Sequence, residues 1–237
     1  MTEIEFGSKR IPFERKPAKS AKYVTIRVSP NKTVTVLASH DIDDRVLASL
    51  ISSKGEWVLE KFQRIDDGAK RNFAREFVSG EGFPFKGKLL RLKVLRLQRP
   101  GENRVYSDTT TLFCEIDSLV AADIEAAVVQ WYKDEARNYL PSRAQRFAKR
   151  LSVKPNAIEI RDQTRRWGSC TKDGRVLLNW RIIMAPPSII DYVLVHELSH
   201  LKANLHTPEF WNWVKAVLPD FDARKKWLRV NGALLSL

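Results

Sequence analysis

Short stretches of alternating apolar and polar residues dominate the first half of the chain. Two such runs within residues 22–38, separated by Ser-Pro-Asn-Lys, predict a β-hairpin. Similar alternation predicts further antiparallel strands at 90–94 and 111–116. A helical spacing of apolar residues over 42–65, interrupted at Gly55, predicts two helical pieces between these strands.

The pattern changes near Leu119, after which helical periodicity prevails. Apolar residues spaced three and four apart predict a helix over 123–140, and the same stripe continues to Leu151. Pro141 predicts a kink or a restart, because proline lacks the amide donor and clashes with the preceding turn. Two strands are predicted at 157–161 and 176–180, flanking a loop that contains Arg165 to Cys170.

The last third of the chain carries the start signals of two helices. Ser188, followed three residues later by Asp191, matches a capping box, and Thr207 before Pro208 predicts a second N-terminus. We therefore predict an α+β fold with two regions. Residues 1–118 form an antiparallel, strand-rich part with one helical segment, and residues 119–237 form a helical part with a small sheet.

Composition narrows the class of protein. The 237 residues carry 41 Lys and Arg against 28 Asp and Glu, a formal net charge of +13, which favours polyanionic partners such as nucleic acid. No apolar run is long enough to span a membrane, and the first residues carry no export signal. Two cysteines, Cys114 and Cys170, exclude a disulfide framework. We expect a soluble, cytoplasmic protein without membrane contact.

Three of the four histidines lie within eleven residues and begin with His196-Glu197-Leu198-Ser199-His200. Positions four apart lie one turn apart on the same face of a helix, so His196 and His200 can bind one metal ion. Glu197 lies beside them, where it can accept a proton from an attacking water. His40, the fourth histidine, is interpreted as a loop residue.

A catalytic zinc ion needs three protein ligands and one open position. His206 is the preferred third ligand because it is close in sequence and lies at a junction between two predicted helices. Glu209, one turn into the next helix, is the rival. Cys170 as a fourth ligand would close the site and leave Glu197 without a role, so we expect it to be a buried thiol.

Several further motifs accompany the histidines. They are Arg166-Trp167-Gly168-Ser169-Cys170, Leu178-Asn179-Trp180-Arg181, the segment Tyr192 to Leu201, Asn204, His206, Phe210 and Trp211. Together these residues resemble the YgjP-like family of predicted zinc metallopeptidases, which is related to the SprT-like proteases. The resemblance is dense over residues 157–217 and looser before them.

The resemblance implies a zincin-like core that binds one Zn²⁺ per chain through His196, His200 and His206, with Glu197 as general base. The expected activity is endopeptidase cleavage of a polypeptide substrate. Tyr192, one turn before His196, and Arg166 are candidates for contacts to the substrate or the transition state.

Two other functions stay open at this stage. The basic surface could bind nucleic acid as its main role or direct a protease to DNA-bound proteins, as the SprT-like resemblance implies. The HExxH motif also fits a hydrolase of a non-peptide amide, because it indicates water activation and not the substrate.

Overall fold

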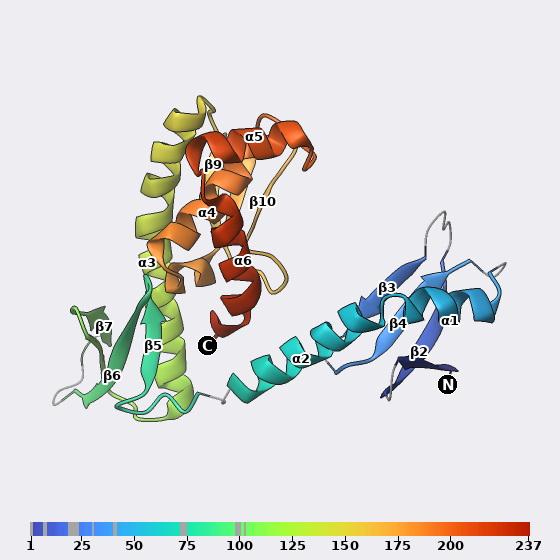
Figure 1. Ribbon diagram of the computed structural model, residues 1–237. Helices are drawn as coiled ribbons and strands as arrows, with labels where there is room; N and C mark the ends of the chain where they lie inside the picture. The colour runs from blue at the N-terminus through green and yellow to red at the C-terminus, as the bar shows by residue number, and fades with distance from the viewer. Residues whose placement is uncertain are drawn as a thin grey trace. The chain divides into compact units, whose positions relative to one another are not determined.

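The computed structural model describes residues 2–6, 9–18, 24–29, 31–39, 42–71, 75–97, 101 and 103–237 (Figure 1). The chain divides into two compact units, Met1–Phe73 and Ala74–Leu237, each with a hydrophobic core of its own. The chemistry-bearing residues of the sequence all lie in the second unit.

The first unit is a four-stranded sheet with two helices. Its strands, in the order β1-β2-β4-β3, are β1 Thr2–Phe6, β2 Lys9–Pro17, β3 Thr25–Val28 and β4 Val34–Ala38, and its helices are α1 Asp44–Ser52 and α2 Gly55–Arg71. Alternate residues of β2 and β4 pack with α1 and α2 in one core: Ile11, Phe13, Val34, Val36, Ala38, Leu47, Ile51 and Val58.

The predicted hairpin is confirmed as the antiparallel pair β3 and β4, and the predicted break at Gly55 separates α1 from α2. Lys22, Tyr23, Pro30 and His40 lie outside the described residues. The strands β1 and β2 were not predicted, because the alternation in β2 spans only Ile11 and Phe13 among many charged residues. The expectation of purely antiparallel pairing is wrong for β2 and β4, which are parallel.

The second unit begins with another four-stranded sheet, which lies beside one end of the long helix α3 (Figure 1). Its strands, in the order β5-β6-β8-β7, are β5 Gly82–Phe85, β6 Lys88–Arg96, β7 Arg104–Ser107 and β8 Thr111–Ile116. The predicted strands are confirmed, but β6 and β8 are parallel and not antiparallel. β8 buries Leu112, Cys114 and Ile116 and lies in the interior of the sheet, whereas β7 is an edge strand.

Helix α3, Ala121–Leu151, runs through Pro141 without ending. The helix does not restart at this proline. Buried residues on both sides of it, Leu140 and Ala144, pack into the same core, so the helix continues. The Tyr132 hydroxyl donates a hydrogen bond to the Pro84 carbonyl at 2.7 Å, which ties α3 to β5.

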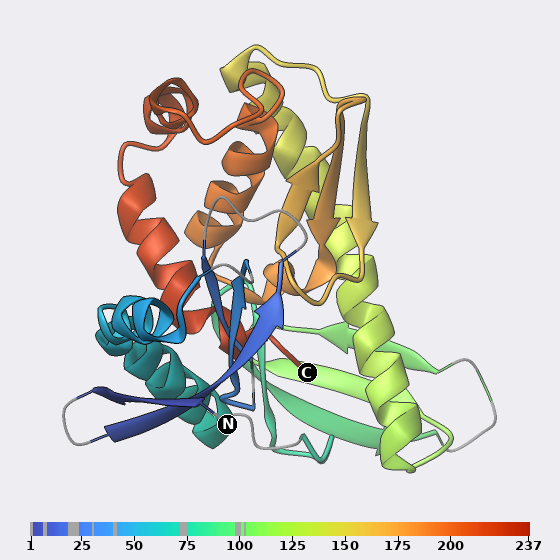
Figure 2. The ribbon, with the colours of Figure 1, turned by 90° about the vertical axis from the view of Figure 1, so that its right-hand side faces the viewer.

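A three-stranded sheet packs beside α3, in the order β10-β11-β9 (Figure 2). Its strands are β9 Ala157–Arg161, β10 Gly168–Cys170 and β11 Arg175–Asn179. β9 and β11 were predicted and are parallel to each other, whereas β10 lies within the segment predicted as a loop.

The remaining elements surround helix α4. They are the 3₁₀ helix η1 Trp180–Met184, the helices α4 Pro187–Ser199, α5 Pro208–Val217 and α6 Phe221–Asn231, and the 3₁₀ helix η2 Gly232–Leu234. Helix α4 contacts α3, α5, α6, η1 and β10, and it buries residues on nearly every face. Figure 2 shows α4 with α6 on one side and the three-stranded sheet on the other.

The predicted capping box of α4 is wrong. The helix begins at Pro187, Pro186 is the N-cap, and no side chain caps it. Asp191 instead accepts hydrogen bonds from the Arg143 guanidinium on α3, one of them at 2.8 Å, so the carboxylate joins two helices. The N-cap predicted at Thr207 is confirmed, since its hydroxyl accepts from the Phe210 amide.

The change of pattern at Leu119 lies inside the second unit. Strands before it and helices after it contribute to one core, which includes Phe83, Leu92, Val128, Trp180 and Leu194. The contact division falls between Phe73 and Ala74, and the first unit has a buried cluster of its own. No helix in the described ranges is long and apolar enough to cross a membrane.

The paired charges of Arg143 and Asp191 give a stability prediction. Their side chains are only 21% and 13% exposed, and Asp191→Asn leaves the guanidinium without its counter-charge. We expect a loss of about 1.5–3 kcal/mol in the free energy of unfolding, measured by urea denaturation. The control is Asp134→Asn, which breaks an exposed pair with Arg137 on the same helix and should cost less than about 1 kcal/mol. Equal losses in the two variants would contradict the account.

Candidate metal centre

Helix α4 and the turn that follows it bring the three histidines together. His196 and His200 are one helical turn apart on α4, and His200 is its C-cap. The chain then turns back on itself, and His206 directly precedes Thr207, the N-cap of α5. His206 is thus held between two helix ends, as the sequence predicts.

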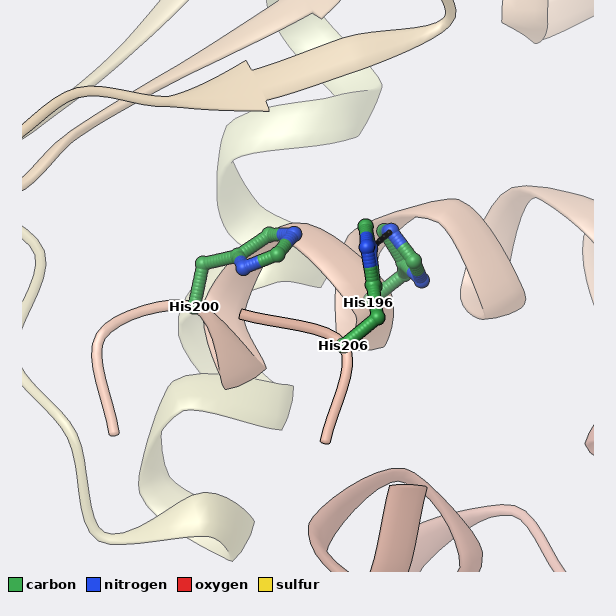
Figure 3. A group of neighbouring side chains, drawn as sticks. All are labelled: His196, His200 and His206. Atoms are coloured by element: carbon green, nitrogen blue, oxygen red, sulfur yellow. Dashed lines mark hydrogen bonds between the residues drawn. The ribbon is translucent and has the colours of Figure 1, made fainter. Parts of the chain in front are cut away.

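The three imidazoles converge on one point (Figure 3). One donor nitrogen from each lies within 4.8 Å of the other two, and these residues form the one such group of metal-binding type among the described residues. The Nε2 atoms of His196 and His206 are 3.0 Å apart, a distance at which two ring nitrogens share a proton or a cation. Neither Glu209 nor Cys170 belongs to the group.

A backbone contact orients the second histidine. The Nδ1 atom of His200 lies 3.3 Å from the Ala203 carbonyl oxygen. This contact favours the tautomer with the proton on Nδ1, which leaves the Nε2 lone pair free for a metal ion. The buried Nδ1 of His196 has no hydrogen-bond partner among the described residues.

Aromatic side chains enclose the group. The buried ring of Phe210 lies 5.0 Å from His196, 4.6 Å from His200 and 4.8 Å from His206, measured between ring centroids. Trp211 stacks against His206, and Lys225 of α6 lies over the Trp211 ring at 4.1 Å. These contacts restrict each imidazole to a small range of orientations.

Burial favours the uncharged form of His196 and His200. Burial lowers the pKa of His196 to about 3, and the neighbouring His200, His206 and Lys225 lower it further in the same direction. Burial also lowers the pKa of His200. Neutral imidazole is the form that binds metal, so the donor set fits a zinc ion.

Glu197 lies beside the histidines on α4 and is 7% exposed. Burial raises the pKa of its carboxyl to about 8, and the charge of Arg166 opposes this shift. Within the described part of the chain the carboxylate has no hydrogen-bond partner, so both oxygens are available to a ligand or water.

Space for this carboxylate depends on Gly168 in β10. A Cβ atom at Gly168 would lie 2.6 Å from Glu197 Cγ and 2.9 Å from both Cδ and Oε1. Those separations are below any normal contact, so only glycine fits here without displacing the carboxylate. The sequence contains Gly168 in the Arg-Trp-Gly-Ser-Cys motif, but its contact with Glu197 requires the fold.

The other predicted residues lie around this centre. The Tyr192 ring is 5.8 Å from the His196 ring, and burial together with the Glu197 and Asp222 charges raises its pKa to about 12. Arg166 is exposed and precedes β10 by two residues. Cys170 is only partly buried, not fully as expected, and burial and the Glu197 charge raise the pKa of its thiol.

Comparison with known proteins identifies the family. A family model described as YgjP-like, metallopeptidase domain, matches residues 22–231. This chain belongs to the YgjP-like family. Metallopeptidases act through a bound metal, and among the described residues of this YgjP-like chain the three histidines form the group that could hold it.

Two further comparisons were made for this YgjP-like protein. A search of curated proteins found no significant match. A solved structure, the crystal structure of the metallopeptidase zymogen of Pyrococcus abyssi abylysin, is similar with 24% identity and a TM-score of 0.36. The similarity covers 40% of the YgjP-like chain and 94% of the abylysin chain.

The close approach of Gly168 to Glu197 predicts the effect of one methyl group. In Gly168→Ala the carboxylate must move, and we expect peptidase activity to fall at least 10-fold, since misplacing a reacting group by about 1 Å can cost about 100-fold. Metal content should not change, because the three atoms nearest to the new methyl group all belong to Glu197 and none to a histidine.

The matched control is Ser169→Ala, since neighbouring strand residues point to opposite faces. Activity is measured on a quenched fluorescent peptide and metal by elemental mass spectrometry. Full activity in Gly168→Ala, or an equal loss in the control, would count against the tight contact.

Proposed function

We propose that this YgjP-like metallopeptidase is a zinc-dependent endopeptidase. In this proposal His196, His200 and His206 hold one Zn²⁺ per chain, and Glu197 is the general base. The observation that carries it is the convergence of three imidazoles, with donor atoms within 4.8 Å of one another, beside the buried Glu197 carboxyl group, which has no hydrogen-bond partner among the described residues.

The donor set supports zinc and an open coordination position. Imidazole nitrogen is a preferred zinc ligand, and three protein ligands are the usual number at catalytic sites. Zinc bound there supplies a Lewis acid that lowers the pKa of water and polarises a carbonyl group. A fourth ligand from Cys170 or Glu209 receives no support from the geometry, since neither side chain joins the group.

Glu197 carries the proton transfers in this mechanism. Zn²⁺ bound beside Glu197 would lower the pKa of this carboxyl from about 8, because a nearby positive charge favours the carboxylate. The carboxylate would then accept a proton from the attacking water and return it to the amine that leaves. The carboxylate is confined by Gly168, which lies against it, and by the burial of α4. Because it makes no hydrogen bond with a described residue, an oxygen is free to accept the proton.

Two side chains are suited to stabilise the developing negative charge on the substrate oxygen. Tyr192 keeps its hydroxyl proton at neutral pH because its pKa is raised to about 12, so it can donate a hydrogen bond. Arg166 is a permanent cation near Glu197. Tyr192 is the better supported of the two, because its ring lies against His196.

The proposal is tested with a quenched peptide blocked at both ends, which only an endopeptidase can cleave. The zinc-loaded protein should cleave it, 1,10-phenanthroline should abolish cleavage, and added zinc should restore it. Glu197→Gln removes the base and should lower kcat at least 100-fold. Glu125→Gln, an exposed glutamate on α3, serves as the control and should keep full activity.

Two results would contradict the proposal. One is a Glu197→Gln variant as active as the wild type. The other is cleavage that persists after the metal is removed.

A further inference from the structure

A cleft opens in the second unit beside the segment that leads into β10. This cleft of about 560 Å³ lies between residues 163–167, η1 and the C-terminal segment 228–237. Its apolar surface comes from Trp167, Leu228 and Leu235. A Cβ atom at Gly232 would lie 3.2 Å from the Trp167 ring, so the C-terminal segment packs closely on that ring.

The charge of this cleft is of one sign. Arg165, Arg166, Arg181 and Arg229 line it, and no acidic residue does. Arg181 pairs with Asp162 and stacks on Trp180. The other three arginines form no salt bridge with any described residue. We call this the arginine cleft.

The wall of the arginine cleft is fixed by a buried side chain. Asn179, 3% exposed, donates through Nδ2 to the Gln163 carbonyl at 2.7 Å and to the Arg166 carbonyl at 3.1 Å. The backbone N–H of Asn179 donates to the Trp167 carbonyl at 2.8 Å. The backbone that carries Arg165 and Arg166 is therefore held rigidly, which lowers the entropy cost of binding a ligand.

The charge of the cleft decides the class of ligand. Arginines without a salt bridge to a described residue favour an anionic group, which a guanidinium binds by charge-assisted hydrogen bonds. Because the proposed activity is the cleavage of peptide bonds, this group is an acidic side chain of a polypeptide.

Two consecutive residues link the arginine cleft to the metal centre. Trp167 lines the cleft, and the next residue, Gly168, contacts Glu197. A polypeptide seated with a side chain in the cleft would continue along β10 toward the carboxylate.

We propose that the arginine cleft binds an acidic side chain of the polypeptide substrate, a few residues from the bond that is cleaved. Arg165 and Arg229 bind the carboxylate, and Trp167 packs against its aliphatic part. This inference rests on the proposed peptidase function and adds a preference for acidic substrates.

Binding and cleavage are measured separately to test it. Zinc-loaded Glu197→Gln protein is titrated into two fluorescein-labelled peptides that differ only by two glutamates replaced with glutamines, and fluorescence anisotropy gives each Kd. The glutamate peptide should bind about 10-fold more tightly, as expected for charge-assisted hydrogen bonds. The ratio of the two Kd values should fall to near one in the double variant Arg165→Gln/Arg229→Gln.

The matched control removes two positive charges elsewhere. Arg146 and Lys149 are exposed on α3 and form no salt bridge with described residues, so Arg146→Gln/Lys149→Gln should keep the preference. An equal loss in this control would overturn the proposal in favour of net charge alone. A preference unchanged in Arg165→Gln/Arg229→Gln would also overturn it.

Nucleic acid is tested in the same assay. A single-stranded oligonucleotide that binds more tightly than the glutamate peptide, with the same dependence on Arg165 and Arg229, would overturn the choice of a polypeptide. If the zinc-loaded wild type cleaves neither peptide while the binding preference persists, the peptidase function fails and the acidic-peptide site stands.

Discussion

The burial of helix α4 is the constraint on which the second unit depends. A helix in contact with α3, α5, α6, η1 and β10 has almost no solvent face, and most of its residues are apolar for that reason. Each polar side chain on such a helix must find a partner or a function. Asp191 binds Arg143, and His196 and His200 converge with His206 on one point where a metal ion fits.

The same burial explains how precisely the centre is built. Phe210 touches all three imidazoles from α5, and Gly168 approaches Glu197 so closely that a methyl group would displace it. Because these contacts come from different elements, the site is assembled only when α4, α5 and β10 pack together. Its rigidity therefore follows from tertiary structure and not from the local sequence around the motif.

Much of this could be predicted from local pattern. The spacing of His196 and His200 depends only on helix geometry, and His206 is located by the Thr207 cap that the sequence displays. The central strands β4 and β8 were found because their alternation is strong. The capping box of α4 was wrong because Asp191 has a tertiary partner on α3 that local sequence does not reveal.

Other features depend on contacts between distant residues. The parallel pairing of β6 with β8 joins two strands that are separated in the chain by β7, which the local pattern does not reveal. Helix α6 was not predicted, because its sequence is rich in charged residues and buries only Phe221. The roles of Gly168 and of the arginine cleft likewise require the fold, since their contacts join residues far apart in sequence.

The most direct test of the account is the zinc content of untagged protein, measured by elemental mass spectrometry after loading with zinc and gel filtration. The account predicts about one zinc per chain in the wild type and in Glu197→Gln, and a loss of zinc in His206→Ala. Zinc retained at the wild-type level in His206→Ala, or a wild type that holds no zinc after loading, would contradict the three-histidine metal centre.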